Sequence, residues 1–415
     1  MPVLSPYRVL DLTTERGLLC GQLLGDMGAD VVKVEPPGGS SARNIGPFFN
    51  DQPHPDRSLY WWAYNRSKRS ITLDIEHELG RNIFRKLVER ADFLIESNSP
   101  GYLAERGLGF SELSAINPRL IYASITPFGQ DGPKASYADS DLIIMAASGP
   151  LILAGDEDRP PVRLTVPQAY LHACADAGVA MLAANHERTR SGLGQYIDVA
   201  AQQSVGMATQ AYILAAALGS TEARRMAGGI KFGPLDIQLV WPAKDGYVAM
   251  TMLFGSALGV FTRRFMHYLC ERGFCDQATR DKDWIQYGEL LFNGTEPLSE
   301  FERIKEIART FTRSHTKNEL LQLSVEHGLL ITPVTTIDEV VDSPQLESRN
   351  YFQSIDHPEL GASFRYPGAF VKFGATPIKY RMRPPTVGEH NREIYESELG
   401  MNASETSELK RKGII

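Results

Sequence analysis

The sequence predicts an α/β protein in which a large domain with a parallel, Rossmann-like sheet is accompanied by a smaller α+β domain. Short apolar runs alternate with helix-like segments in the first half of the chain, and a hairpin signal follows in the second half. β-type segments then return near the C-terminus. Single strands that alternate with helices are typical of parallel sheets, whereas a tight turn between two strands requires antiparallel pairing.

The large domain is predicted from its first βαβ unit. Residues 8–12 form a β-type run, residues 17–27 are compatible with a helix, and residues 31–35 form the next β-type run. Gly28 interrupts the helical pattern and Pro36 ends the second strand. The same alternation predicts strands at 70–74, 93–96 and 120–125 and a helix over 78–90. A strand is also expected to end just before Pro167, where a long apolar helix starts that leads to a strand at 195–198.

Each predicted strand ends in a polar or Gly/Pro-rich loop, which is where open α/β sheets bind ligands. No GxGxxG motif follows the first strand, so dinucleotide binding is not favoured. Neither a P-loop nor a GxSxG nucleophile motif is present.

The composition changes after about Gly219, and this change sets the predicted domain boundaries. Residues 236–241 and 247–250 are β-type runs around the turn at 244–246, residues 261–327 are rich in helix signals, and residues 328–334, 364–368 and 371–373 return to β-type patterns. We therefore expect the first part of the large domain at 1–205, a linker at 206–225, the small domain at 226–330, and a return segment at 331–415 that completes the large domain.

Composition excludes several classes of function. The net charge of −7 does not suit a general nucleic-acid binder, since phosphates need a basic excess. Four scattered cysteines without a CxxC pair argue against a disulfide framework or a metal site. With no basic-apolar leader and no apolar run long enough to span a bilayer, we expect a cytoplasmic protein without membrane contact.

Several motifs, in order along nearly the whole chain, resemble the class III (CaiB/BaiF-type) CoA-transferases. They are VLDL at 9–12, GADVVKVEPPG at 28–38, NRSKRS at 65–70, NPRLIY at 117–122, FGQDGP at 128–133, RTRSGLGQ at 188–195, KDGY at 244–247 and PTVGEHN at 385–391. The resemblance implies two chains interlocked in a dimer, with CoA or acyl-CoA bound as a substrate and no tightly bound cofactor. It also implies a carboxylate that attacks the acyl-CoA to give a mixed anhydride, which CoA thiolate converts into an enzyme thioester.

CoA carries a pyrophosphate and a 3′-phosphate, so its site needs cations or free backbone N–H groups. In the matched motifs the candidates are polar or basic residues near predicted strand ends; the cations among them could equally be solvated surface charges. These candidate CoA contacts are Arg16, Asn65, Lys68, Arg69, Ser97, Asn98 and Arg106.

The family places its nucleophilic aspartate in the pattern Val-Pro-x-x-Asp, and here that position holds Tyr170. A carboxylate is ionised at neutral pH, whereas a tyrosine with a reference pKa of about 10 is mostly protonated and would form an ester rather than an anhydride. Tyr170 is therefore interpreted as an aromatic residue that fills the vacated acyl pocket. An acid–base pair of His172 and Asp176, one helical turn apart, is a weaker alternative because no nucleophile accompanies it.

Other departures from the family pattern concern the same site. Leu18 stands where the family has glycine and is expected to add bulk near the thiol end of CoA. Ser140 and Asp141 stand where racemase members carry His-Asp, and residues 96–101 lack the family's aromatic residue. Gly228 and Gly229 correspond to a lid that closes over the acyl group in some members, although a plain turn is an equal interpretation.

Three functions are consistent with this pattern. The first is a non-catalytic subunit of a CoA-transferase, paired with a related chain that carries the aspartate in an interlocked heterodimer or heterotetramer. Benzylsuccinate CoA-transferase is a two-subunit member of this kind, which suggests succinate and an aromatic dicarboxylate as the acids exchanged. The alternatives are an acyl-CoA isomerase or lyase on the same fold, and a catalytically inactive homodimer that binds or regulates.

Overall fold

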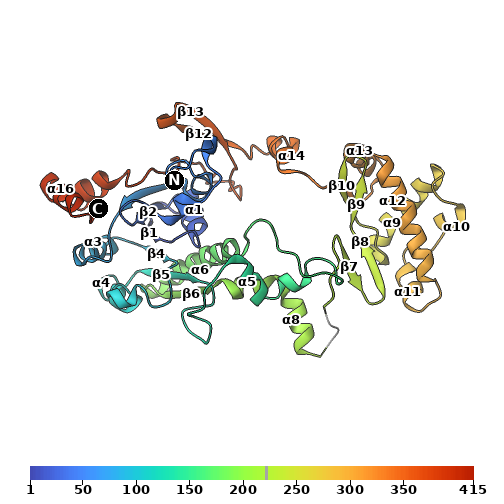
Figure 1. Cartoon of the computed structure of the whole chain (residues 1–415), viewed down its shortest axis with the longest axis horizontal. Coiled ribbons are helices and arrows are strands. Elements are labelled where there is room, and N and C mark those ends of the chain that lie inside the picture. Colours follow the sequence, from blue (N-terminus) through green and yellow to red (C-terminus); the bar gives the residue numbers. More distant parts are fainter. Residues whose placement is uncertain (220–222) are drawn as a thin grey trace. The chain divides into compact units, whose positions relative to one another are not determined.

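The computed structural model describes residues 1–219 and 223–415 (Figure 1). The chain divides into two compact units. Unit 1 contains residues 1–150, 164–210 and 344–415, and unit 2 contains residues 151–163 and 211–343. Both chain ends therefore belong to unit 1, and unit 2 takes in the segment 151–163 in addition to the middle of the chain.

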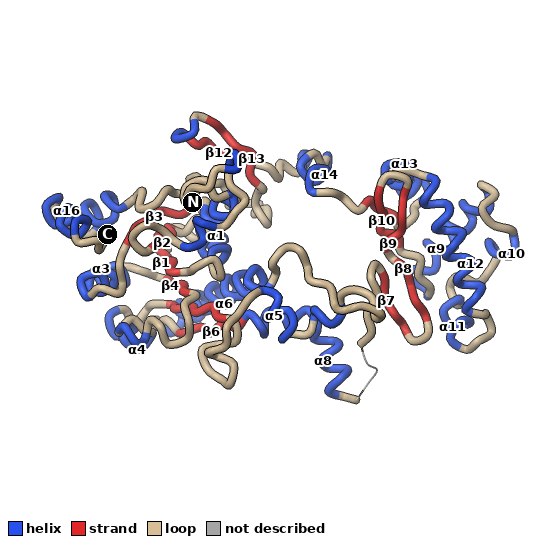
Figure 2. Tube along the Cα trace, viewed as in Figure 1, coloured by secondary structure: helices blue, strands red, loops and turns tan. Residues whose placement is uncertain are grey.

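Unit 1 is built on a six-stranded, wholly parallel sheet with strand order β3-β2-β1-β4-β5-β6 (Figure 2). This order is the one typical of Rossmann folds, and it reverses between β1 and β4. The predicted parallel α/β sheet is thereby confirmed. The strands are β1 (Arg8–Leu12), β2 (Asp30–Glu35), β3 (Lys68–Thr72), β4 (Phe93–Glu96), β5 (Ile121–Thr126) and β6 (Tyr196–Ala200).

Helices cover both faces of the sheet, as parallel strands require. On one face α1 and α6 pack against each other and against the strands; on the other lie α3 and α4. The helices of unit 1 are α1 (Leu18–Asp26), α2 (Leu59–Asn65), α3 (Glu78–Val88), α4 (Phe110–Ile116), α5 (Asp141–Ala147), α6 (Ala169–Ser191), α7 (Ala201–Gly206), α15 (Pro344–Ser348) and α16 (Ala403–Arg411).

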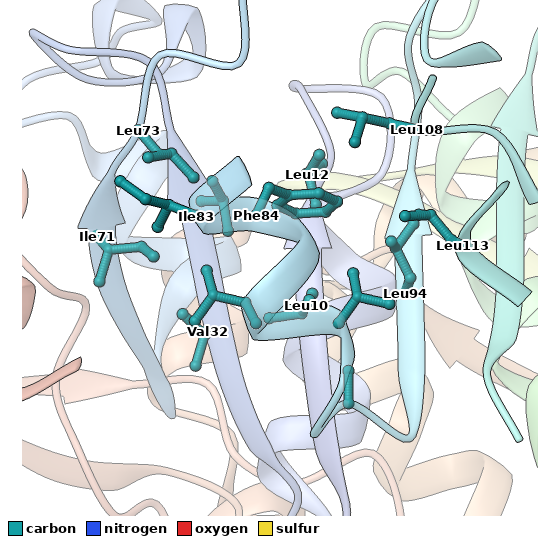
Figure 3. Close-up of a cluster of buried hydrophobic side chains, with 14 of the residues drawn as sticks. Leu10, Leu12, Val32, Ile71, Leu73, Ile83, Phe84, Leu94, Leu108 and Leu113 are labelled. Carbon is teal, nitrogen blue, oxygen red and sulfur yellow. The ribbon is translucent and has the colours of Figure 1, made fainter. Parts of the chain in front are cut away.

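The core on the α3 side explains why these segments become strands. Leu10, Val32 and Leu94 point from three adjacent strands toward Phe84 of α3 (Figure 3). Alternate residues of each strand face this cluster, and the others face α1 and α6. Because both faces are buried, the strands read as continuous apolar runs rather than as alternating patterns.

The C-terminal segment completes this core. Ile394 and Tyr395 belong to the same cluster, and the Tyr395 hydroxyl donates to the Thr72 carbonyl at 2.6 Å. A short antiparallel pair, β12 (Gln353–His357) with β13 (Ala362–Tyr366), precedes it.

Unit 2 has an antiparallel sheet in the order β11-β10-β9, a separate β7–β8 pair, and packed helices. The hairpin predicted around 244–246 is present, since β9 pairs antiparallel with β10. The elements are α8 (Gln210–Ala217), β7 (Gly229–Phe232), β8 (Leu235–Gln238), β9 (Val240–Ala243), β10 (Gly246–Met250), α9 (Gly255–Glu271), α10 (Gln277–Arg280), α11 (Tyr287–Phe292), α12 (Leu298–Ser314), α13 (Lys317–His327), β11 (Ile331–Pro333) and α14 (Ile337–Val341).

Some sequence-based boundaries were wrong. β3 begins at Lys68 rather than at residue 70, because the charged side chains at its start are buried against carboxylates of neighbouring elements. Residues 371–373 and the segment just before Pro167 are not strands. Among the described residues, no helix is long and apolar enough to cross a membrane.

Candidate functional site at the sheet switch point

A pocket of about 260 Å³ opens at the carboxyl ends of the strands around the point where the strand order reverses. Crevices at this position are the usual ligand sites of open α/β sheets. The pocket is lined by the last residues of β1 and β2 and by residues that follow β1, β2, β3 and β4: Leu12, Thr13, Thr14, Lys33, Val34, Glu35, Pro36, Ser40, Ser41, Leu73, Asp74, Ile75, Glu76, Asn98 and Tyr102.

The connection from β1 to α1 is fixed from two sides. The Thr14 amide donates to the Ser97 hydroxyl at 2.8 Å, and the Tyr60 hydroxyl donates to the Glu15 carbonyl at 3.1 Å. Ser97, a predicted CoA contact, thus holds one wall of the pocket, while its neighbour Asn98 lines the pocket directly.

Beneath the pocket, Asp11 is fully buried between two lysines. Its carboxylate contacts the ammonium groups of Lys33 at 3.1 Å and of Lys68 at 2.9 Å. Burial opposes ionisation of Asp11, but the two cations outweigh it and lower its pKa to about 2. A side chain at Gly21 would bring its Cβ to 2.2 Å from the Asp11 carboxylate, so only glycine lets α1 approach this closely.

Lys68 and Asn65 are therefore committed to the interior. The Lys68 ammonium also donates to the Leu18 carbonyl at 2.8 Å and to the Asn65 side chain at 3.0 Å, which uses all three of its protons. Because Lys68 is 0% exposed, we assign it a structural role rather than contact with phosphate.

Arg69 is likewise occupied. Its guanidinium pairs with Asp30 at 2.6 Å and with Glu393 and Glu398 of the C-terminal segment at 2.9 and 2.6 Å. These pairs tie the return segment to the sheet, and they leave Arg69 no free face for a ligand anion in this structure.

Arg106 is the predicted cation that lies at the edge of the pocket. It stacks on the Tyr102 ring at 3.6 Å and pairs with Glu76 at 2.9 Å, and both of these partners line the pocket. Glu76 is more than half exposed, and exposed ion pairs contribute only about 0–1 kcal/mol. A phosphate could therefore take the place of Glu76 at little cost.

Tyr170 lies in the first turn of α6, where the family resemblance expects the nucleophile. The turn is capped by Asp141, whose carboxylate accepts from the amides of Gln168 at 2.6 Å and Ala169 at 2.8 Å. Ser140 accepts from the Ile143 amide and so caps α5. The Ser140-Asp141 pair thus fixes the starts of two helices.

The Tyr170 hydroxyl donates to Asp139, and Arg16 pairs with the other oxygen of the same carboxylate at 2.7 Å. The structure therefore brings two predicted site residues, Arg16 and Tyr170, together around a third that the sequence reasoning missed. The signal that could have revealed it is the Asp139-Ser140-Asp141 pattern, in which only the second acid was considered.

Two further expectations change. Leu18 does not project toward the ligand site: its side chain is 1% exposed and packs into a core cluster with Ala42 and Trp61. Within the described residues, no hydrogen bond or ion pair joins His172 to Asp176, so the structure gives the acid–base alternative no support.

The predicted lid glycines lie in unit 2. The Gly228 carbonyl accepts from the amides of Leu239 and Val240, each at 2.8 Å, and Gly229 begins β7. Gly228 has a φ of +65°, which favours glycine. A role as a lid stays a prediction.

Comparison with known proteins agrees with the motifs. The sequence profile described as CoA-transferase family III matches residues 4–391. The succinyl-CoA:(R)-benzylsuccinate CoA-transferase subunit BbsE of Thauera aromatica is 37% identical over 413 residues, which cover 99% of this chain and 98% of that protein. The succinyl-CoA–D-citramalate CoA-transferase of Chloroflexus aurantiacus is 30% identical, with 99% of this chain and 98% of the relative covered.

Solved structures extend the likeness to three dimensions. The crystal structure of a CAIB/BAIF family protein from Brucella suis superposes with a TM-score of 0.80 at 27% identity, covering 95% of this chain and 99% of that one. Motifs, fold and full-length relatives therefore agree, and the chain belongs to CoA-transferase family III.

Proposed function

We propose that this chain is a subunit of a CoA-transferase that moves CoA between carboxylic acids, and that the nucleophilic aspartate is supplied by a related partner chain. The observation that carries the proposal is Tyr170 in the first turn of α6. Burial raises its pKa, and so does the hydrogen bond to Asp139, so the phenol is protonated at neutral pH. A protonated phenol cannot form the anhydride that exchange between acids requires.

Substrate CoA would bind in the pocket at the switch point. Asn98 and Tyr102 offer polar and aromatic contacts there, and Arg106 supplies the cation that a phosphate needs. Replacing Arg106 by alanine should weaken CoA binding several-fold and leave folding unchanged. Arg190, which is 75% exposed near the end of α6, is the matched control; equal effects of the two substitutions would remove Arg106 from the site.

Exposed apolar side chains support an obligatory partner. None of the residues of α8 is buried, and its apolar side chains Tyr212, Ile213 and Leu214 are 54%, 54% and 60% exposed. In unit 1, Val179 of α6 is 69% exposed. Apolar helices left uncovered in this way mark interaction surfaces, and a related subunit in an interlocked heterodimer or heterotetramer would cover them.

The acids exchanged are proposed from the relatives. Both curated relatives described above are named for transfer from succinyl-CoA, and the more similar of them is a subunit of a benzylsuccinate enzyme. We therefore infer succinate as one acid and an aromatic dicarboxylate as the other. In this scheme Gly228 and Gly229 would close over the acyl group.

Co-expression with a related chain that carries the Val-Pro-x-x-Asp pattern tests the proposal. We expect the two chains to purify together, which native mass measurement would detect. The complex, but not this chain by itself, should transfer CoA from succinyl-CoA to benzylsuccinate. Transfer by the purified lone chain would contradict the proposal. Acyl-CoA isomerisation or elimination by a homodimer, or CoA binding without turnover and without a partner, would favour one of the two alternative functions.

A further inference from the structure

Asp139 has no part in the proposed transfer, yet it contacts two of the predicted site residues, Arg16 and Tyr170. Its side chain is 8% exposed. One carboxylate oxygen accepts from the Arg16 guanidinium at 2.7 Å and the other from the Tyr170 hydroxyl. Each oxygen thus has its own donor, which is how proteins recognise the carboxylate of a bound organic acid.

The backbones that carry the two donors are held without Asp139. Tyr170 belongs to the first turn of α6, which Asp141 caps. The Arg16 carbonyl accepts from the Cys174 thiol at 3.6 Å, one turn further along α6. Both residues are therefore positioned by contacts that do not involve the Asp139 side chain.

We propose that Arg16 and Tyr170 form a binding site for an organic carboxylate, and that this chain fills the site with its own Asp139. An acyl-CoA can then place its acyl group there only after the Asp139 side chain is removed. The location beside bound CoA rests on the proposed function, whereas carboxylate recognition by Arg16 and Tyr170 does not. In a heteromer built with this chain, the working acyl sites would lie on the partner chains.

Acetate is the simplest probe of the carboxylate site. Asp139→Ala should bind acetate, measured by calorimetry against chloride at equal ionic strength, whereas the wild-type chain should not. Arg16→Gln combined with Asp139→Ala should abolish the acetate binding. Glu187→Ala is the matched control, because it removes one carboxylate from the far end of α6 and should gain no acetate binding.

Acetate binding equal in the wild-type chain and in Asp139→Ala would overturn the proposal, and so would its absence from Asp139→Ala. If the alanine variant does not fold, Asp139→Ser serves in its place, because it also removes the carboxylate and leaves a smaller polar side chain. The measurement uses the chain in the complex in which it purifies and counts the acetate sites gained over the wild-type complex, because a partner chain contributes the same sites to both.

A second measurement locates the site relative to CoA. The probes are free CoA and a non-hydrolysable succinyl-CoA thioether. In the wild-type complex only the partner's acyl sites should bind the thioether more tightly than CoA. Asp139→Ala should add one such tight thioether site for each copy of this chain, at least tenfold tighter than its site for CoA, while leaving CoA binding unchanged. A wild-type complex that already has a tight thioether site on every chain would overturn self-occupation. Acetate binding by Asp139→Ala without a gain for the thioether would keep the carboxylate site and place it away from bound CoA.

Discussion

Two carboxylates of unit 1, Asp11 and Asp139, each bridge two side chains from distant segments, and their surroundings differ. Asp11 is 0% exposed between Lys33 and Lys68 under the sheet switch point. Asp139 lies at the edge of the fold between Arg16, whose side chain is 28% exposed, and Tyr170. The buried group stabilises the fold, because two cations depend on it for neutralisation, whereas the outer group can be removed without leaving a buried charge unpaired.

Asp11→Asn should produce the largest effect. It leaves Lys33 and Lys68 buried with no opposite charge between them, and breaking a buried pair in this way costs about 3–5 kcal/mol. The measurement is the free energy of unfolding in urea. A loss as small as that caused by Asp139→Asn would end the distinction between the two carboxylates.

The stability of the protein should depend on pH through Asp11, over the range between its ordinary pKa and its pKa in the folded protein. The pKa of Asp11 falls from an ordinary 3.8 to about 2 on folding. Its ionised form therefore stabilises the folded protein fully at a pH above 3.8, and this stabilisation is lost as the pH falls toward 2. The difference corresponds to about 2 kcal/mol. The difference in unfolding free energy between the wild-type chain and Asp11→Asn should therefore shrink over this range and be constant above it. A constant difference throughout would show that Asp11 is not the group responsible.

Asp139→Asn should cost only about 1 kcal/mol, the usual net contribution of a hydrogen bond, because the Arg16 guanidinium that loses its charged partner is 28% exposed and remains in contact with water. Urea unfolding measures this directly. A cost near that of Asp11→Asn would mean that Asp139 is a structural residue and that its place at the acyl site is incidental.

Tyr170→Phe should have a still smaller effect on stability, about 0.5 kcal/mol, because Arg16 continues to hold the Asp139 carboxylate. The same substitution removes one donor of the proposed carboxylate site. In the Asp139→Ala background it should weaken acetate binding several-fold, and unchanged acetate affinity would exclude the phenol from recognition.

Tyr170→Asp alone should restore no CoA transfer. Since Leu18 packs into the core, the reason is not steric: the new carboxylate would lie near Asp139, and like charges that share one cation disfavour the ionised form. Tyr170→Asp combined with Asp139→Ser removes this repulsion. Turnover by the single variant, assayed with succinyl-CoA, would contradict this explanation.

The sequence by itself determined the parallel sheet, the hairpin of unit 2, the family, and the presence of a tyrosine where the family resemblance expects the nucleophile. These properties depend on local patterns: apolar runs between turn residues predict strands, and the residue after Val-Pro-x-x is read directly as Tyr170. The boundaries of strands were predicted less well, as β3 shows. Local sequence patterns do not predict a strand that begins with the polar residues Lys68 and Arg69.

Only the tertiary structure decided what the polar side chains do. Lys68 and Arg69 had the composition of a phosphate site, but partners as distant in sequence as Asp11 and Glu398 bring them into the protein. Asp139 became a site residue because Arg16 and Tyr170 converge on it from segments far away in the chain. A charge acts according to its nearest opposite charge and its exposure to water, and both are set by long-range packing that local sequence patterns do not contain.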